Sequence, residues 1–455
     1  MTSRPLLTIV LAAGKGTRMK SRVPKVLHKV GGLSLIGHVL STVRALDSSR
    51  LAVVIGRDMD AVRSAALAAA PGADIFVQEQ QLGTAHAVLA ARQAIAGHQG
   101  DVLVLFSDTP LMQPPAPAAL RDRLDDKTAL SVLGFDAADP TGYGRLLRDA
   151  NGDLLEIREH KDASDAERTI SFCNSGVMAF RSETMLDLLD RIGTGNAQGE
   201  YYLTDAVALA RAAGYRVATE SCDEAEVLGI NSRNQLAAAE AIFQQRKRAQ
   251  AMADGATLIA PETVWFSHDT VIGRDVVIEP NVFFGPQVTI EDDVHIHANC
   301  HIEGAQLRRG VEVGPFARLR PGADLGEKAK IGNFVEVKNT AVGPGAKANH
   351  LAYLGDGRVG AHANIGAGTI FCNYDGFFKH MTEVGEGAFV GSNSSLVAPV
   401  SIGAGAFVGS GSVITKDVPA DSLALERSEQ DVREGWAAKF RTMMQRRKAA
   451  SKGRT

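Results

Sequence analysis

A loop rich in glycine and cations follows the first apolar run of the chain. It reads LAAGKGTRM over residues 11–19. Gly14 and Gly16 permit close backbone approach and offer unhindered N–H donors to phosphate oxygens. Arg18 can grip a phosphate bidentately, and Lys25, in the following segment PKVLH, adds a further cation. The types and spacing of these residues predict a phosphate-binding loop.

A carboxylate stands where the strand-like run DVLVLF ends, in the sequence Ser107-Asp108-Thr109-Pro110. A carboxylate in that place can hold Mg²⁺, with phosphate oxygens and water completing the octahedron. Taken alone, Asp108 could equally cap a turn or a helix. The phosphate-binding loop earlier in the chain favours the metal role.

These motifs, together with the segment QEQQLGTAHA, resemble the signature of the sugar-phosphate nucleotidylyltransferases. The resemblance implies in-line attack of a sugar 1-phosphate on the α-phosphorus of UTP, with release of pyrophosphate and no protein nucleophile. It implies that Lys25 and Arg18 act by positioning and charge neutralisation, and that Asp108 and Asn231 hold Mg²⁺. The residues that it assigns to UTP and N-acetylglucosamine 1-phosphate are Leu11, Ala12, Ala13, Gly14, Lys25, Gln78, Gly83, Thr84, Ser107, Gly144, Glu159, Asn174 and Asn231.

Within this set the resemblance separates a base-reading group from a sugar-reading group. Gln78 and the backbone near Gly83 are expected to read the imide edge of uracil through paired donors and acceptors. The backbone of Gly144 and the side chains of Glu159 and Asn174 are expected to contact the sugar and its N-acetyl group.

One departure from the family pattern precedes the metal carboxylate. Phe106 and Ser107 stand where the family usually has a tyrosine and a glycine. A tyrosine-hydroxyl contact to the sugar is therefore either lost or replaced by Ser107.

Unusual polar residues also gather in the second half, where a repeating pattern breaks. His350 lies in KANHLAY, and CNYDG follows in the next break. Arg320 and Lys338 can bind an anionic phosphate.

The segments ARLRPG, NFVEVK, HLAYLGD, NIGAGT and CNYDG resemble the glucosamine-1-phosphate acetyltransferases over this whole half. The resemblance makes His350 the general base that deprotonates the amine, a role typically worth ~10²–10⁴ in rate. Glu336 is a possible assistant to His350, and Ser410 replaces the usual alanine. The resemblance assigns glucosamine 1-phosphate to Arg320, Lys338, Tyr353 and Asn364, and acetyl-CoA to Ala367, Asn373, Tyr374, Ser392, Ser410 and Arg427.

Both motif sets together cover nearly the full chain. The sequence therefore resembles a family of bifunctional enzymes that carry N-acetylglucosamine-1-phosphate uridylyltransferase and glucosamine-1-phosphate N-acetyltransferase activities. The resemblance implies that acetylation precedes uridylyl transfer in the synthesis of UDP-N-acetylglucosamine. It also implies a homotrimer whose acetylation site lies between neighbouring subunits.

The elements that must position these residues fall into two halves. Apolar runs alternate with helical patterns up to about residue 230, which predicts a Rossmann-like α/β domain with a mostly parallel sheet and ligands at the carboxyl ends of its strands. We expect domain 1–230, a linker helix at 231–254, a β-helix at 255–430 and a basic tail at 431–455. The expected strands and helix of the first domain are Leu6–Leu11, Leu51–Ile55, Asp101–Phe106, Ala129–Phe135 and Gly83–Ala96.

The second half has a period of six. Ile272, Ile278, Phe284, Ile290, Ile296 and Ile302 form one series, and Val276, Val282, Val288, Val294 and Cys300 form another. A hexapeptide repeat predicts a parallel β-helix with three short faces per coil and large aliphatic residues inside. The acetyltransferase resemblance makes that helix left-handed. The pattern breaks near 304–310, 349–358 and 371–383, where loops are expected to leave the coil.

Composition restricts the remaining possibilities. The net charge of −3 over 455 residues does not point to nucleic acid, and no stretch approaches the ~20 apolar residues of a membrane helix. The four cysteines form no CxxC pair and are expected to be buried, reduced thiols of a cytoplasmic protein. His295, His297 and His301 alternate along regular coils and are expected to face outward. The tail, with eight Lys or Arg against two acids, is expected to be solvated and partly disordered.

Two alternatives remain open. One is a nucleotidylyltransferase whose β-helix only regulates or assembles it, which would not need His350, Lys338 or Asn373-Tyr374. The other is a non-enzymatic assembly subunit of the same architecture, which would have a degraded metal pair, whereas Asp108 and Asn231 are both present.

Overall fold

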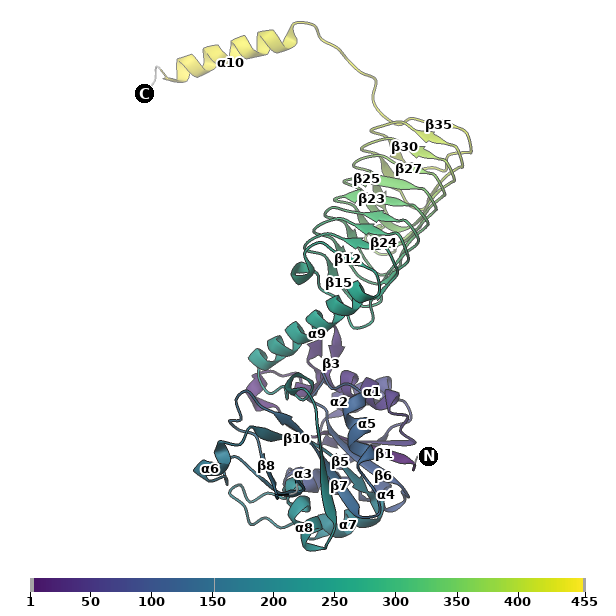
Figure 1. The fold of residues 1–455 in the computed structure, drawn as a ribbon. Coiled ribbons are helices and arrows are strands. Elements are labelled where there is room, and N and C mark those ends of the chain that lie inside the picture. Colours follow the sequence, from purple (N-terminus) through teal and green to yellow (C-terminus); the bar gives the residue numbers. More distant parts are fainter. Residues whose placement is uncertain (1–3, 151, 453–455) are drawn as a thin grey trace. The chain divides into compact units, whose positions relative to one another are not determined.

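The computed structural model describes residues 4–150 and 152–452, which fold into two compact units (Figure 1). The first unit comprises 1–253 with 265–270, and the second comprises 254–264 with the chain from 271 onward. The helix expected as a separate linker, α9 (Arg233–Ala253), therefore packs as part of the first unit.

The first unit contains a Rossmann-like mixed sheet with the strand order β11-β7-β10-β6-β1-β4-β5. Every pair on this path is parallel except those made by β10, which runs antiparallel to β6 and β7. A hairpin of β8 and β9 joins at β10. The strands are β1 (Leu6–Ala12), β4 (Arg50–Gly56), β5 (Asp74–Gln78), β6 (Asp101–Phe106), β7 (Thr128–Asp136), β8 (Arg145–Arg148), β9 (Leu154–Arg158), β10 (Phe172–Arg181) and β11 (Arg216–Ser221).

Apolar residues cover both faces of this sheet, as the uniformly apolar strands predict. Leu7, Ile9 and Leu11 of β1 join one buried cluster, while Leu6 and Val10 join the cluster on the other face. The helices that bury the faces are α1 (Leu35–Ala45), α2 (Asp60–Ala69), α3 (Thr84–Ala90), α4 (Arg92–Ala96), α5 (Pro115–Asp122), α7 (Ser182–Asp190) and α8 (Ala206–Ala212). The short helix α6 (Asp165–Arg168) has no buried residue. The predicted helix Gly83–Ala96 is divided at Ala91 into α3 and α4.

Short segments complete the first unit. Its two-stranded sheet pairs β2 (Lys29–Val30) with β3 (Leu33–Ser34). The 3-10 turns are η1 (Thr17–Met19), η2 (Lys25–Leu27), η3 (Leu203–Asp205) and η4 (Glu224–Glu226).

The second unit is a left-handed parallel β-helix in which each strand pairs with its equivalent one coil away. One face consists of β12 (Thr257–Leu258), β14 (Val277–Ile278), β17 (His295–Ile296), β20 (Glu312–Val313), β23 (Lys330–Asn333), β25 (Lys347–His350), β27 (Asn364–Ile365), β30 (Phe389–Val390), β33 (Phe407–Val408) and β35 (Leu423–Ala424). The other strands are β13 (Val271–Ile272), β15 (Phe283–Phe284), β16 (Thr289–Ile290), β18 (His301–Ile302), β19 (Ala305–Leu307), β21 (Arg318–Leu319), β22 (Ala323–Leu325), β24 (Glu336–Val342), β26 (Tyr353–Val359), β28 (Ile370–Cys372), β29 (Thr382–Val384), β31 (Ser395–Val397), β32 (Val400–Ile402) and β34 (Val413–Ile414). The turn η5 (Pro261–Thr263) follows β12.

The hexads predict the interior of this β-helix correctly. Both six-spaced series are buried except Ile272, which is partly exposed. A third six-spaced series turns the corners with positive φ, in the left-handed region that Asn and Asp tolerate best. It consists of Asp275, Asn281, Gln287, Asp293 and Asn299, with φ between 56° and 63°.

Only one of the three breaks in the repeat leaves the coil. Residues 304–310 contain β19, and 349–358 contain parts of β25 and β26, which all pair with neighbouring coils. The third break does project, because β28 ends at Cys372 and a hairpin with a bridge between Tyr374 and Lys379 precedes β29. The first two predicted loops were wrong because those segments change the spacing of the repeat without interrupting its strand pairing.

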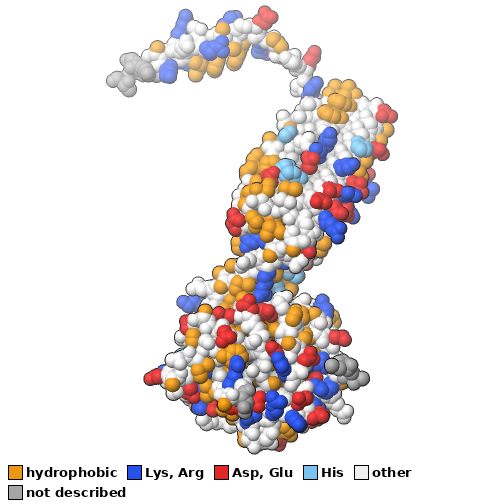
Figure 2. Space-filling view, viewed as in Figure 1, with side chains coloured by type: hydrophobic (Ala, Val, Ile, Leu, Met, Phe, Trp, Pro, Cys, Tyr) orange, Lys and Arg blue, Asp and Glu red, His pale blue; other side chains and the backbone are white. Residues whose placement is uncertain are grey.

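The basic tail forms a helix, α10 (Trp436–Lys452), where partial disorder was expected. Its side chains are exposed over the described positions up to 450, and Figure 2 shows hydrophobic and basic side chains along it. Within 4–150 and 152–452, no helix combines the length and apolarity needed to cross a bilayer.

Candidate functional site

The predicted phosphate-binding loop begins where β1 ends. Gly16 adopts φ +61°, and a Cβ at this position would collide with the Cβ of Lys25. Glycine therefore lets the loop fold onto the segment that carries Lys25. Arg18 lies on η1 with an exposed side chain, outside the residues that line the adjoining cavities.

Lys25 lies at the centre of the predicted metal pair. Its Nζ donates to Asp108 Oδ2 at 2.6 Å and to Asn231 Oδ1 at 2.9 Å. Asp108 follows β6 and Asn231 precedes α9, and the Ile230 backbone N–H donates to the Asp108 carbonyl at 2.9 Å. The two oxygens thus already converge around one cationic group, which is the arrangement that a divalent ion requires of its ligands.

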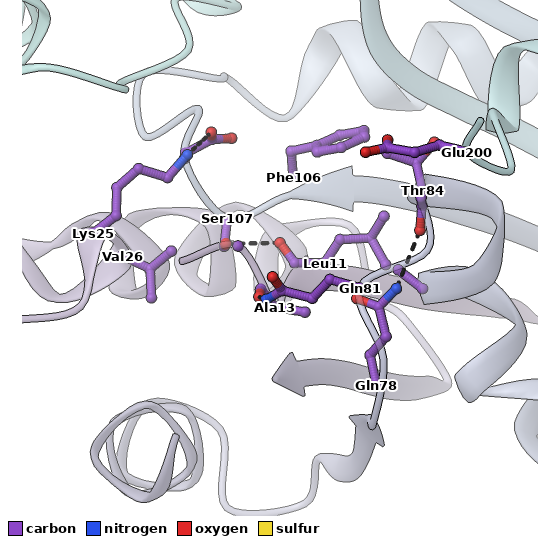
Figure 3. Close-up of a pocket in the computed structure, with 14 residues that line it drawn as sticks. Leu11, Ala13, Lys25, Val26, Gln78, Gln81, Thr84, Phe106, Ser107 and Glu200 are labelled. Carbon is purple, nitrogen blue, oxygen red and sulfur yellow. Dashed lines mark hydrogen bonds and ion pairs between the residues drawn. The ribbon is translucent and has the colours of Figure 1, made fainter. Parts of the chain in front are cut away.

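A cavity of about 330 Å³ opens beside this group (Figure 3). It is lined from the carboxyl ends of β1, β5 and β6, as expected for a parallel sheet. The predicted residues that line it are Leu11, Ala13, Gly14, Lys25, Gln78, Gly83, Thr84, Ser107 and Asp108. Ala12 does not line it, because its side chain is buried in the sheet.

The predicted base-reading segment is tied to a second loop. Gly83 has φ +120°, and a Cβ there would collide with the backbone of Tyr201. The Ala85 N–H donates to the Tyr201 carbonyl at 3.0 Å. The side-chain amide nitrogen of Gln78 contacts the Gly83 carbonyl and His86 Nδ1, both at 3.1 Å. The amide oxygen of Gln78 is thereby left as the acceptor for a ligand.

Phe106 and Ser107, which stand where the resembled family usually has a tyrosine and a glycine, lie at the wall of the first cavity. Ser107 is buried, and its hydroxyl donates to the Leu11 carbonyl at 2.7 Å (Figure 3). It lines the first cavity but not the second. Phe106 lines both cavities, and a Cβ at Gly176 would meet its ring. The Ser107 hydroxyl is thus bonded to the backbone of β1, and the ring of Phe106 lines the second cavity.

A second cavity, of about 260 Å³, shares Thr84, Phe106 and Asp108 with the first. Its lining includes the three predicted sugar-reading residues, Gly144, Glu159 and Asn174. The Asn174 side-chain oxygen accepts from the Gly176 N–H at 2.9 Å, so its NH₂ group is the part available to a ligand. Burial raises the pKa of the Glu159 carboxyl, and a hydrogen bond from the Thr204 hydroxyl opposes this.

In the second unit, four predicted residues stack along one corner of the β-helix. The carbonyls of His350, Ala367 and Ser392 each accept a backbone hydrogen bond from the following coil, from Gly368, Asn393 and Gly411. Ser410 comes next in this row, and its carbonyl accepts from Arg427 Nη1 at 3.0 Å. The row brings His350, the predicted general base, and the residues expected to bind acetyl-CoA onto one edge.

The partner of His350 is Asn333, which lies opposite it in the preceding coil. Nδ1 of His350 lies 2.7 Å from Asn333 Oδ1. Because a carbonyl oxygen can only accept, Nδ1 carries the hydrogen, and Nε2 has the lone pair when the ring is neutral. The suggested partner Glu336 instead accepts from Arg320 Nη1 at 2.8 Å.

A buried carboxylate joins a residue predicted to bind glucosamine 1-phosphate to one predicted to bind acetyl-CoA. Asp356 accepts from Lys338 Nζ at 3.1 and 3.2 Å, from Asn339 Nδ2 at 2.8 Å, and from Asn373 Nδ2. Burial alone would raise the pKa of Asp356, but the hydrogen bonds from Asn339, Lys338 and Asn373 hold it below its usual value. Nearby, contact with the ammonium of Lys338 lowers the pKa of Lys379.

The remaining predicted residues lie around these two groups. Arg320 directly follows β21, which pairs with β24. Tyr353 begins β26, which also pairs with β24, and its ring folds over Gly355. Asn364 lies on the other side of the His350 corner, on β27. Tyr374 is exposed at the projecting hairpin, where its hydroxyl donates to the Gly376 carbonyl at 2.6 Å.

Sequence reasoning missed several residues that contact the predicted ones. Asn333 and Asp356 each lie 17 residues from a predicted partner, which is one coil of this β-helix. Three hexads make 18 residues, so the hexads predict this spacing to within one residue. Thr204 and Tyr201 had no such signal, because they come from a loop far along the chain.

Comparisons with known proteins agree with both units. The MobA-like NTP transferase domain family matches residues 8–170, and the bacterial transferase hexapeptide family (six repeats) matches 269–304 and 381–416. "Bifunctional protein GlmU" of Azorhizobium caulinodans is 60% identical over 97% of this chain and 98% of its own length. The proteins of the same name from Xanthobacter autotrophicus and Chelativorans sp. are 57% and 56% identical, over 97% and 100% of this chain and 98% and 100% of their own lengths.

Proposed function

The chain belongs to the family of bifunctional GlmU proteins, and on that basis we propose which of its residues carry each reaction. It is a uridylyltransferase and an N-acetyltransferase in the synthesis of UDP-N-acetylglucosamine. The observation that carries the assignment is the presence of two separate polar centres, one around Lys25 in the first unit and one around His350 in the second.

For uridylyl transfer, we assign the bound ion to Asp108 and Asn231 and the phosphates of UTP to Lys25 and the loop N–H groups. The side-chain oxygens of Asp108 and Asn231 both lie within 2.9 Å of the Lys25 Nζ, so this pair suits Mg²⁺. The ion would neutralise the charge that develops on the phosphates. Lys25 would hold the phosphates next to that charge. Arg18, exposed on η1, would have to swing inward to assist.

The order of the two cavities supports a nucleotide-to-sugar path. Uracil would occupy the cavity with Gln78, whose free amide oxygen can accept from the imide N–H. The sugar would occupy the cavity with Glu159 and Asn174, whose NH₂ group can donate to an N-acetyl carbonyl. The reacting phosphates would then meet at Asp108, which lines both.

Binding of N-acetylglucosamine 1-phosphate should weaken as the pH falls. Because burial raises the pKa of Glu159, this carboxyl takes up a proton at a higher pH than an ordinary glutamate and stops accepting from sugar hydroxyls. We expect the KM for N-acetylglucosamine 1-phosphate to rise as the pH falls through this raised pKa, by about 10- to 100-fold when protonation is complete. Glu159→Gln should have a high KM that no longer depends on pH in this range. An equal pH dependence in wild type and variant would contradict this role.

For acetyl transfer, His350 would take the proton of the amino group through Nε2, which the hydrogen bond between Nδ1 and Asn333 leaves unprotonated. The amine then attacks the thioester carbonyl of acetyl-CoA. We place acetyl-CoA along the corner row that ends at Arg427, and the sugar phosphate at Arg320, Lys338 and Tyr353.

Asp356 should matter to acetylation although it was not among the predicted contacts. Asp356→Asn removes the charge that holds Lys338 and Asn373, so both subsites lose their alignment. We expect kcat/KM for acetylation to fall about 10- to 100-fold, the equivalent of one charged hydrogen bond, with uridylyl transfer unchanged. Asp324→Asn is the matched control, because Asp324 pairs with Arg308 elsewhere on the β-helix. An unchanged kcat/KM for acetylation in a folded Asp356→Asn protein would refute the role.

We also propose a homotrimer in the cytoplasm. Stacked aromatic pairs lie exposed on the β-helix, Phe316 with Phe334 and Phe389 with Phe407, and Figure 2 shows exposed hydrophobic patches on this unit. Neighbouring β-helices would cover them. UTP and acetyl-CoA are cytoplasmic substrates.

The proposal is tested by product analysis with glucosamine 1-phosphate, acetyl-CoA, UTP and Mg²⁺. Free CoA, pyrophosphate and UDP-N-acetylglucosamine are expected in equal amounts. Omitting acetyl-CoA should suppress pyrophosphate release, because the sugar cavity offers an amide donor to the N-acetyl group. Formation of UDP-glucosamine at an equal rate would show that the proposed order of reactions is wrong.

A further inference from the structure

Three side chains from two successive coils meet on the outer surface of the β-helix, near its start. They are Glu279, which follows β14, and His295 and His297, which belong to and follow β17. Val277 pairs with His295 and Ile278 with Ile296. Side chains alternate along a strand, so with the isoleucines buried inside, all three polar residues point outward.

These side chains converge on one atom. Oε1 of Glu279 lies 2.9 Å from His297 Nδ1 and 3.2 Å from His295 Nε2. The imidazole rings stack, with 4.2 Å between their centroids. One ligand atom from each residue lies within 4.8 Å of the other two.

The surroundings hold this arrangement in place. The other oxygen of Glu279 accepts from the Ala298 N–H at 2.9 Å, which fixes the plane of the carboxylate. Each of the three side chains keeps between 28% and 39% of its surface exposed, so the group is neither deeply buried nor freely mobile. In the next coil Glu312 pairs with His295 in register, but its carboxylate is engaged by Lys330 at 2.8 Å.

We propose that Glu279, His295 and His297 form a binding site for a divalent ion of the zinc class, which would cross-link two successive coils. Two imidazole nitrogens and one carboxylate oxygen are the ligand set of Zn²⁺, whereas Mg²⁺ prefers oxygen alone. Bonds of about 2.0–2.2 Å at tetrahedral angles place ligand atoms roughly 3.3 Å apart, so small side-chain shifts suffice. The solvent side leaves a fourth position for water. His297 also lines a cavity of about 390 Å³ together with Asn333 and His350, so the test of this site measures metal binding and not acetylation.

The test is a Co²⁺ titration of the full-length protein, freed of metals with a chelator and then supplied with excess Mg²⁺ to fill the oxygen-ligand site at Asp108. We expect one Co²⁺ per chain with the visible absorption of tetrahedral coordination, and displacement by Zn²⁺. His295→Gln and Glu279→Gln should weaken binding at least 10-fold. His301→Gln is the matched control, because His301 is exposed on the same β-helix and stacks on Phe283.

Absence of the tetrahedral band, or equal affinity in a folded His295→Gln protein, would overturn the proposal and leave the three residues as a hydrogen-bonded cluster. X-ray absorption of the zinc-loaded wild type gives a readout that does not depend on how the variants fold. Two imidazoles and at least one oxygen at about 2.0 Å are expected. A shell of sulfur, or of oxygen alone, would refute the assignment.

Discussion

Replacing Asp108 by alanine should stop pyrophosphate release while the same protein continues to acetylate glucosamine 1-phosphate. The carboxylate is one of the two side chains assigned to the metal, and it also holds Lys25 at 2.6 Å. We expect uridylyl transfer to fall on the order of 10²–10³-fold or more, the size of effect seen when one preorganised charge-stabilising group is removed. Pyrophosphate release and CoA release are measured on one preparation.

Alanine also leaves the buried Lys25 ammonium without its counter-ion, so the isosteric Asp108→Asn variant is the necessary companion. It keeps an acceptor for Lys25 but removes the charge. Asp60→Asn is the control, because Asp60 is an exposed carboxylate on α2. A folded Asp108→Asn protein with wild-type uridylyl transfer would show that this carboxylate is not a metal ligand.

Replacing His350 by alanine should have the opposite effect. Acetylation is expected to fall about 10²–10⁴-fold, the usual contribution of a general base, while uridylyl transfer from supplied N-acetylglucosamine 1-phosphate is unaffected. Because the side chain is exposed, added imidazole should restore part of the activity. His301→Ala should behave as wild type in both assays.

A companion variant tests the role of the second nitrogen. Asn333→Ala removes the acceptor that keeps the hydrogen on Nδ1 of His350. The expected result is a lower kcat with little change in either KM, since substrate contacts remain. If His350→Ala lost both activities while still folded, the separation of the two centres would be wrong.

The sequence predicted both architectures because the spacing of apolar residues differs between the two units. Apolar runs alternate with helical patterns in the first unit, and apolar residues recur every six positions in the second. The six-residue spacing of Ile278 and its equivalents could only serve a narrow core, and the structure buries them. The tail was predicted less well, since a high density of Lys and Arg masks a helix whose apolar residues Trp436, Phe440, Met443 and Met444 recur at helical spacing.

The site was predictable in outline and not in its supporting contacts. The motifs place Gln78 and Ser107 near a ligand. Only the structure shows that the NH₂ group of Gln78 already contacts the Gly83 carbonyl and His86. Likewise, the hydroxyl of Ser107 donates its hydrogen bond to the Leu11 carbonyl. Which polar atoms of these side chains remain available to a ligand depends on backbone atoms far away in the sequence. No local sequence pattern encodes the positions of those atoms.

The stacked corner from His350 to Ser410 sets a length scale for whatever lies along it. Adjacent strands are roughly 4.8 Å apart, so each coil adds one fixed step between the imidazole and Arg427. The number of coils between His350 and Arg427 therefore fixes how long a ligand lying along this corner can be. Inserting or deleting a whole coil would preserve the fold but change the distance from His350 to Arg427 by one strand spacing. The corner would then select acyl carriers with a longer or shorter arm.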